Sequence, residues 1–458
     1  MKMRFTTAIT CILFVGITQA QDDPVITSWL QNTTVTGTYY VTGNSTTLEN
    51  NILVNCQQIE YSDEFVYVHA TGVPAYATGP FQDGNPSNAE DQEAIYKFTR
   101  DPQPSGGANT ETTPGNIGVF VNGVSLFDYR DGVAWDPDAN ALCGGPGNPT
   151  CPGGPGSSQD WNRDAIPAEM GGFDCSKAHP AMGNYHHHQN PSAFDLDVEV
   201  VSDVCNLYDA DGLYAISASD HSPLIGFAYD GYPIYGAYGY TNADGTGGIT
   251  RIKSGYQLRD ITTRETHADG STVDQGPDVS TTYWLGYFRE DYGWVEHTGE
   301  EDYLDEHNGR ECVTPEYPDG TYAYFCTVDE NWNSAYPYVI GPTFYGEYEN
   351  ASVTSVTEPT TIYTGVNSLE EGYLEGIEMN IFPNPSSDLV AMQVSGLLKK
   401  NLQIKVYDSR GQLVHESQLN MGSTVWHWDT QTVYSGQYFM HITDGEDSVV
   451  KQLSLMKD

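Results

Sequence analysis

The chain has 458 residues and a formal net charge of -43, because 62 Asp and Glu residues outnumber 19 Lys and Arg residues. Such an acidic surface repels nucleic acids and anionic membranes and attracts cations, which argues against a nucleic-acid-binding protein. The 47 Gly and 32 Tyr residues, together with little helical periodicity, favour a mainly β protein with long loops.

Residues 1–20 have the pattern of a secretory signal peptide. A short basic segment precedes an apolar run, residues 5–17, that is too short to span a bilayer. Ala20 is the small residue expected at the cleavage site, and Cys11 lacks the flanking residues of a lipoprotein signal. No later segment is apolar enough to cross a membrane. We therefore expect an exported, soluble protein that begins at Gln21.

The negative charge is concentrated in residues 21–376, which hold 53 acidic and 11 basic residues. Solubility in a salty exterior is the simpler explanation of this excess, and calcium binding is the functional alternative. Acidic turns at residues 131–138 and 209–212 are weak calcium signals, because neither completes an EF-hand loop. Calcium therefore stays open as a ligand.

A β-rich body with long loops is expected over residues 21–350. Alternating segments such as 64–69, 118–121 and 321–325 are each bounded by turn residues. A segment of this length can form one large core or two smaller ones.

Seven cysteines remain after removal of the signal peptide, and an oxidising exterior favours disulfides between them. They are Cys56, Cys143, Cys151, Cys175, Cys205, Cys312 and Cys326. Cys143 and Cys151 flank a Gly- and Pro-rich loop that a disulfide could close. Cys312 and Cys326 flank a turn, residues 318–320, so a disulfide could link two strands of a hairpin. The odd number leaves at least one cysteine unpaired.

Residues 185–188 read Tyr-His-His-His and are the strongest chemical signal in the body. Side chains alternate between the two faces of a strand, so His186 and His188 can point to one cation while His187 points away. Imidazole suits zinc, copper, nickel or iron, and a catalytic zinc needs three protein ligands. A solvated strand edge or aromatic packing is the alternative explanation of three adjacent histidines.

The third ligand must come from another segment. His221 is the preferred candidate, because it begins another motif-rich segment, residues 221–236. His179 lies seven residues before His186 and could fold back toward it. Asp230 and nearby tyrosines could orient the imidazoles, but Asp-Gly and Tyr-Pro are turn sequences in their own right, and we favour a tight turn at this segment.

The tetrapeptide, together with residues 221–236, 304–310 and 318–324, resembles the YHYH-domain family, which is named for this motif. The match departs at the third position, where His187 replaces Tyr. The resemblance covers roughly residues 115–345, and the order and spacing of its segments make it specific. The family has no established activity, so the resemblance implies a type of domain and not a reaction.

Residues 351–376 are rich in Ser, Thr and Glu and are expected to form a linker. After them, alternating segments such as 402–408 and 435–442 are separated by turn residues. This pattern predicts a small β-sandwich over residues 377–458.

The C-terminal segment carries a series of landmarks: Phe-Pro-Asn-Pro at 382–385, Val-Tyr-Asp at 406–408, Ser-Gly-Gln-Tyr at 435–438, and Lys451. In these it closely resembles the type A C-terminal sorting domain of the type IX secretion system of Bacteroidota. The resemblance implies recognition by the type IX secretion machinery and passage across the outer membrane. Removal of the domain and release, or attachment to the outer cell surface, would follow.

Two classes of function follow. The first is a metal-binding or metal-handling surface protein, with His186, His188 and His221 as ligands and copper or zinc as the metal. The second is an extracellular enzyme or binding protein of polysaccharide degradation, because this export route often carries degradative enzymes; Tyr-rich loops would then bind a glycan or small molecule. Whether the protein is an enzyme stays open.

The absence of common catalytic motifs narrows the possible enzyme classes. The chain has no Gly-x-Ser-x-Gly, His-Glu-x-x-His or nucleotide-binding loop. Residues 305–307, Asp-Glu-His, could supply an acid/base pair, but a solvated acidic loop is the simpler explanation.

Overall fold

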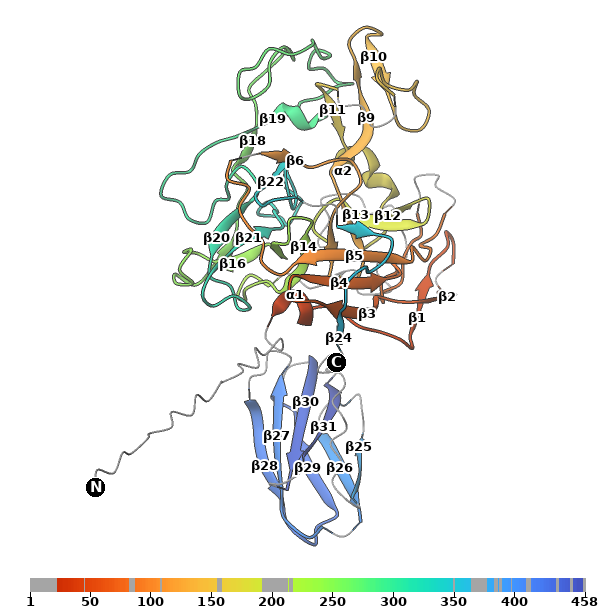
Figure 1. The fold of residues 1–458 in the computed structure, drawn as a ribbon, viewed down its shortest axis with the longest axis vertical. Coiled ribbons are helices and arrows are strands. Elements are labelled where there is room, and N and C mark those ends of the chain that lie inside the picture. Colours follow the sequence, from red (N-terminus) through yellow and green to blue (C-terminus); the bar gives the residue numbers. More distant parts are fainter. Residues whose placement is uncertain are drawn as a thin grey trace, which may run out of the picture. The chain divides into compact units, whose positions relative to one another are not determined.

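The structure is a computed structural model. In it the chain forms two compact units, Met1–Tyr363 and Thr364–Asp458 (Figure 1). The expected signal peptide, Cys205 and the acidic turn at 209–212 lie outside the described residues. The structure describes residues 23–44, 46–81, 87–107, 109–154, 159–191, 213, 217–348, 351–363, 377–382, 386, 389–396, 398–408, 413–433, 436–444 and 448–455.

The centre of the first unit is an eight-stranded mixed sheet with the order β12-β13-β8-β7-β14-β15-β21-β20. Its strands are β7 (Asn116–Phe120), β8 (Ser125–Phe127), β12 (Ala178–Ala181), β13 (Asn184–His187), β14 (Leu224–Ala228), β15 (Pro233–Tyr235), β20 (Gly309–Cys312) and β21 (Thr321–Phe325). Every residue of β14 and β15 is buried, because both faces of the sheet are covered at its middle. Two neighbouring pairs, β13 with β8 and β15 with β21, are parallel.

A five-stranded antiparallel sheet with the order β23-β5-β4-β3-β24 belongs to the same unit. Its strands are β3 (Cys56–Tyr61), β4 (Phe65–Ala70), β5 (Ala94–Thr99), β23 (Ser352–Val353) and β24 (Thr361–Tyr363). Trp29 stacks on Phe98 of β5 and also lies against Phe227 of β14, with ring centroids 5.3 and 5.4 Å apart. The two sheets therefore share one main core, to which aromatic rings contribute much of the buried area.

Short elements complete the first unit. They are α1 (Pro24–Thr27), α2 (Ala165–Glu169), η2 (Met170–Gly172), η3 (Arg289–Asp291), β1 (Thr36–Tyr39), β2 (Leu48–Leu53), β6 (Thr110–Glu111), β9 (Arg130–Asp136), β10 (Ala141–Cys143), β11 (Asn162–Asp164), β16 (Tyr238–Tyr240), β17 (Ile249–Arg251), β18 (Tyr256–Leu258), β19 (Tyr292–Trp294) and β22 (Thr343–Phe344). Residues 259–288 form neither helix nor strand, but the buried Arg264 anchors this loop through an ion pair with Asp291 at 2.7 Å. The predicted mainly β fold with long loops is confirmed.

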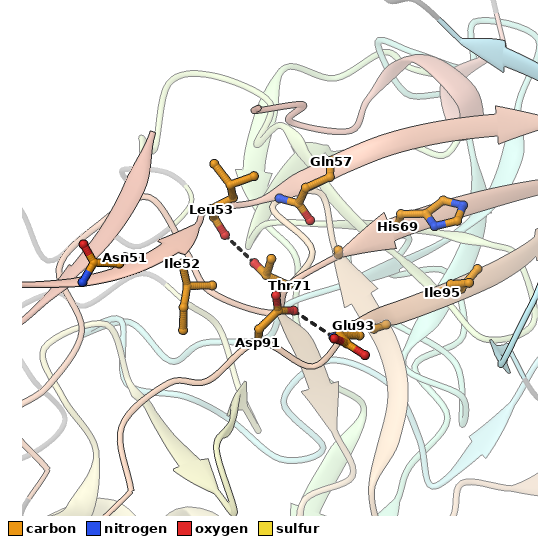
Figure 2. Close-up of a pocket in the computed structure, with 11 residues that line it drawn as sticks. Asn51, Ile52, Leu53, Gln57, His69, Thr71, Asp91, Glu93 and Ile95 are labelled. Atoms are coloured by element: carbon orange, nitrogen blue, oxygen red, sulfur yellow. Dashed lines mark hydrogen bonds between the residues drawn. The ribbon is translucent and has the colours of Figure 1, made fainter. Parts of the chain in front are cut away.

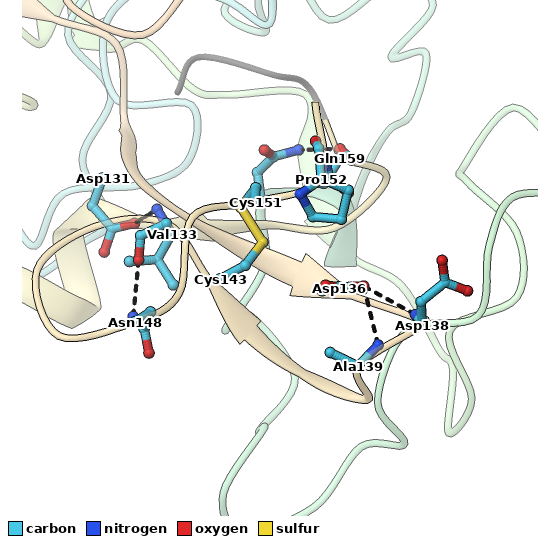
Figure 3. Close-up of a disulfide and its surroundings, with 12 residues drawn as sticks. Asp131, Val133, Asp136, Asp138, Ala139, Cys143, Asn148, Cys151, Pro152 and Gln159 are labelled. Carbon is cyan, nitrogen blue, oxygen red and sulfur yellow. Dashed lines mark hydrogen bonds between the residues drawn. A yellow bond between two sulfur atoms is a disulfide. The ribbon is translucent and has the colours of Figure 1, made fainter. Parts of the chain in front are cut away.

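Cys143 of β10 and Cys151 form the predicted disulfide, which closes the Gly- and Pro-rich loop (Figure 3). The loop sits on the three-stranded sheet β10-β9-β11, whose antiparallel pairing brings Cys143 opposite Ala134. Cys175 is disulfide-bonded as well.

The second predicted disulfide, between Cys312 and Cys326, is wrong, because both thiols are free and buried. The expected hairpin does form from β20 and β21, but its register places Cys312 opposite Thr321 and Gly309 opposite Tyr324. The two cysteines are therefore offset by about five residues along the strands, roughly 16 Å. That separation is far beyond the roughly 4.4–6.8 Å between the Cα atoms of a disulfide.

The expected linker, residues 351–376, differs in its first part. There β23 pairs with β5 and β24 pairs with β3, so this segment extends the five-stranded sheet at both edges. Glu358, between these strands, accepts hydrogen bonds from Ser62 Oγ (2.9 Å) and Tyr67 Oη (2.7 Å). β-branched residues favour strands, so short edge strands can form here although the sequence lacks a strong apolar alternation. Residues 364–376 lie outside the described residues.

The second unit is a small β-sandwich of a three-stranded sheet, β25-β26-β29, and a four-stranded sheet, β28-β27-β30-β31. Its strands are β25 (Glu378–Phe382), β26 (Leu389–Ser395), β27 (Leu402–Asp408), β28 (Leu413–Leu419), β29 (Val425–Asp429), β30 (Gly436–Thr443) and β31 (Ser448–Leu455). Val390 and Met392 from one sheet share a buried core with Ile404 and Met440 from the other. The predicted C-terminal β-sandwich is confirmed.

Candidate metal centre

Three buried histidines meet at the hairpin formed by β12 and β13. The antiparallel register places His179 opposite His186. The two-residue connection, Met182 and Gly183, has φ values of 49° and 86°, as in a type I′ turn, whose twist matches that of the strands. The ligand atoms of His179, His186 and His188 lie within 4.8 Å of one another. Across the part of the chain that the structure describes, no other three His, Cys, Asp or Glu side chains converge in this way.

Backbone carbonyls determine which nitrogen carries the proton in two of these imidazoles. His186 Nδ1 donates to the Asn184 carbonyl (2.8 Å), and His188 Nδ1 donates to the Asp128 carbonyl (2.7 Å). Because a carbonyl oxygen only accepts, each Nδ1 is protonated, and the neutral form of each ring therefore has its lone pair on Nε2. The two Nε2 atoms are 3.1 Å apart. Two lone pairs at this distance repel, so the arrangement favours a cation beside them.

Glu169, the last residue of α2, brings a carboxylate to the same place. Its Oε2 lies 3.3 Å from His179 Nε2 and 3.3 Å from His188 Nε2. Neither contact has the angles of a hydrogen bond, and this buried oxygen has no other donor among the described residues. A buried carboxylate oxygen without a donor again favours a cation.

Aromatic rings enclose the cluster. Phe127 stacks on His186 with ring centroids 3.8 Å apart, and Phe173 lies 5.0 Å from His179 and 6.2 Å from His188. Burial, followed by the neighbouring imidazoles, lowers the pKa of His186 well below its ordinary value. His186 is therefore neutral at pH 7, which is the form of imidazole that binds metals.

His187 points away from the cluster, as the alternation of side chains along β13 predicts. Its Nε2 lies 3.0 Å from Tyr76 Oη, and its ring packs edge-on against Phe120 at 5.4 Å. Burial lowers the pKa of His187 to about 3. This histidine is therefore a neutral packing residue outside the cluster.

His221, the third ligand expected from the sequence, lies outside the cluster. Its Nδ1 donates to the Ser222 carbonyl (2.7 Å), and its ring packs against Tyr235 and Tyr240 with centroids 5.2 and 4.9 Å away. The structure brings His179, and not His221, to His186 and His188, because the turn between β12 and β13 reverses the chain within a few residues.

Asp230, the alternative candidate for orienting the imidazoles, is bonded elsewhere. Its Oδ2 accepts hydrogen bonds from Tyr324 Oη (2.6 Å) and from the Gly346 amide (2.8 Å). The carbonyls of Asn184 and Asp128 orient the imidazoles in its place.

The other acidic segments named from the sequence bind groups of the protein itself. Asp305 accepts a hydrogen bond from Tyr322 Oη at 2.9 Å. In the turn at 131–138, Asp131 pairs with Arg163, and Asp136 accepts backbone amides of its own turn (Figure 3). These contacts leave neither segment arranged around a common cation.

Residues 95–337, more than half of the chain, match the family described as YHYH protein. This chain belongs to the YHYH protein family. Glu169 and the three clustered histidines all lie inside the matched segment, and the family tetrapeptide appears with His187 at its third position.

Residues 380–456 of this YHYH protein match the secretion system C-terminal sorting domain. The match confirms the resemblance seen in the sequence and indicates secretion or attachment at the outer cell surface, with the type IX machinery as a partner. No helix among the described residues is both long and apolar enough to cross a membrane.

Other comparisons add little. A crystal structure of dimeric latent PorU from Porphyromonas gingivalis is similar over 24% of this chain and 11% of that chain, with 16% identity and a TM-score of 0.16. No curated protein matches the chain.

Proposed function

We propose that this secreted YHYH protein binds one transition-metal ion through His179, His186 and His188, with Glu169 as a fourth ligand. The observation that carries the proposal is a pair of Nε2 atoms 3.1 Å apart in a buried site, on two rings whose Nδ1 atoms both donate to backbone carbonyls. A divalent cation would use these lone pairs and balance the charge of the Glu169 carboxylate.

Zinc or copper is the proposed metal. Three imidazole nitrogens and one carboxylate oxygen suit both ions, and four protein ligands complete the tetrahedral shell of a closed zinc site. The carbonyl hydrogen bonds to His186 and His188 resemble the outer contacts that fix the tautomers of metal-binding histidines. A filled shell supports a binding or structural role for the metal.

Metal content of the mature full-length protein tests the proposal. After loading with zinc or copper and dialysis, we expect about one ion per chain by elemental analysis. The double variant His186→Ala/His188→Ala should hold none, whereas His221→Ala, which removes a histidine outside the cluster, should hold as much as the wild type. Glu169→Gln should weaken binding about 10–100-fold.

An independent readout is the thermal unfolding temperature. A ligand that binds only the folded state raises this temperature, so metal should stabilise the wild type and His221→Ala but not the double variant. The proposal fails if the wild type holds neither metal, or if the double variant retains as much as His221→Ala does.

A further inference from the structure

A cavity of about 450 Å³ opens in the first unit beside β18 and β19, and none of the clustered histidines lines it. Its volume lies in the range of small-molecule sites. Its lining combines aromatic rings with ionisable groups, among them Tyr256, Trp294, Tyr336, Glu111, Arg289 and Glu290. The cavity in Figure 2 is of similar volume, about 440 Å³, but its lining contains no Tyr, Trp or Phe.

The aromatic side chains of the cavity beside β18 and β19 are held by contacts at their polar ends. Tyr256 Oη donates to the Glu306 carbonyl at 2.8 Å, and Trp294 Nε1 donates to the Leu304 carbonyl at 3.3 Å. Tyr336 stacks on Tyr292, which also lines the cavity, with ring centroids 4.3 Å apart and an angle of 5° between the ring planes. Because the polar ends are engaged with the protein, these residues contribute mainly apolar ring surface, already fixed in place.

The ionisable groups form a mixed set. Arg289 Nε lies 2.6 Å from Glu290 Oε1, while Glu111, whose side chain is 64% exposed, lies 3.8 Å from the guanidinium. Arg289 Nη1 is buried and has no hydrogen-bond acceptor among the described residues. Donors and acceptors therefore lie next to each other beside the fixed rings.

These charges decide the class of ligand. An anion would meet Glu111, Glu290 and Asp269 together with the strongly acidic body, and a cation, although the acidic body attracts it, would offer no acceptor to the buried Arg289 Nη1. An uncharged polyol meets neither obstacle: its hydroxyl groups can pair with the carboxylates and the guanidinium, and its C–H faces can lie on the rings. We propose that this cavity binds a neutral oligosaccharide.

Titration calorimetry on the mature full-length protein tests this binding. The probes are cellohexaose, laminarihexaose and mannohexaose as neutral chains, a hexagalacturonate as an anion and a chitosan hexamer as a cation. We expect at least one neutral hexasaccharide to bind. Trp294→Ala should weaken that binding about 10-fold, the size of effect expected for the loss of one stacking ring. Glu111→Gln, at an exposed side chain, provides a second variant with a smaller loss and little risk to folding.

Trp284→Ala is the matched control, because this tryptophan is 45% exposed but does not line the cavity. It should bind the same sugar as the wild type does. Binding of none of the neutral probes, binding of a charged probe alone, or an equal loss in Trp294→Ala and Trp284→Ala would each overturn the proposal. The metal-site variants His186→Ala/His188→Ala should bind the sugar normally, which separates this site from the metal centre.

Discussion

At the scale of single residues, the candidate metal centre depends on the partners of each imidazole more than on the number of histidines. His187 is buried and His221 is partly buried, and each ring packs against aromatic neighbours away from the cluster. His221 also donates its Nδ1 proton to a backbone carbonyl, as His186 and His188 do, but only in the latter two do the Nε2 atoms lie side by side, 3.1 Å apart. The surroundings of Nε2 therefore distinguish the proposed ligands from His221.

Asp230 provides a residue-scale prediction about pH. Burial raises its pKa from 3.8 to about 6, although hydrogen bonds from Tyr324 and Gly346 oppose the shift. A raised pKa means that the folded state favours the protonated carboxyl group. The stability that this group contributes is therefore full below about pH 4 and is lost as pH rises through about 6, a change of about 3 kcal/mol.

We expect the free energy of unfolding of the wild type, relative to Asp230→Asn, to fall by about this amount between pH 4 and pH 7 and then to level off. Urea unfolding at several pH values measures the difference. Asp138→Asn, which removes a carboxyl group at an exposed turn position, is the matched control variant. A difference for Asp230→Asn that does not vary with pH would contradict the prediction.

At the scale of elements, short-range connections decide which residues meet. The turn at Met182 and Gly183 brings His179 opposite His186, and the loop closed by Cys143 and Cys151 spans a sequence separation of only 8. Both features follow from local sequence, since few chain conformations separate the partners.

The disulfide at Cys143 gives an element-scale prediction. Closing a loop of this length stabilises the folded state by about 2–3 kcal/mol in the chain-entropy model. We expect Cys143→Ser/Cys151→Ser to lower the free energy of unfolding of the first unit by about this amount in urea. Reduction is a poor substitute for the variant, because Cys175 is disulfide-bonded too.

Alkylation in denaturant without reductant, followed by mass spectrometry, checks the assignment of the cysteines. Cys56, Cys312 and Cys326 should be modified, and Cys143 and Cys151 should be protected. Protection of Cys312 would show instead that the hairpin disulfide forms.

At the scale of the whole molecule, the chain consists of two compact units, and the last strands of the first unit extend to Tyr363. The body should therefore fold without the sorting domain. We expect a chain of residues 21–363 to unfold at the same temperature as the body does in the longer chain of residues 21–458, which retains the sorting domain. A chain of residues 21–350 should unfold at a lower temperature, because it lacks β23, β24 and the hydrogen bonds of Glu358.

Differential scanning calorimetry of the three chains makes this comparison. Equal unfolding temperatures for residues 21–350 and 21–363 would mean that β23 and β24 do not stabilise the body. A lower temperature for 21–363 than for the full protein would mean that the two units are energetically coupled.

The sequence by itself determined the features that arise from local patterns. Period-two alternation indicated the mainly β fold, motif landmarks identified the body and the sorting domain, and strand geometry set His186 and His188 on one face. The disulfide of the 143–151 loop was also predictable, because its partners are close along the chain.

Only the tertiary structure decided the contacts made between separate elements. It selected His179 over His221, placed Glu169 at the cluster although no motif marks it, and set Cys312 apart from Cys326. Each of these depends on strand register or on how α2 packs against β9 and β11. A register shift of one residue reverses every side chain, and sequence pattern alone leaves that register undetermined between distant segments.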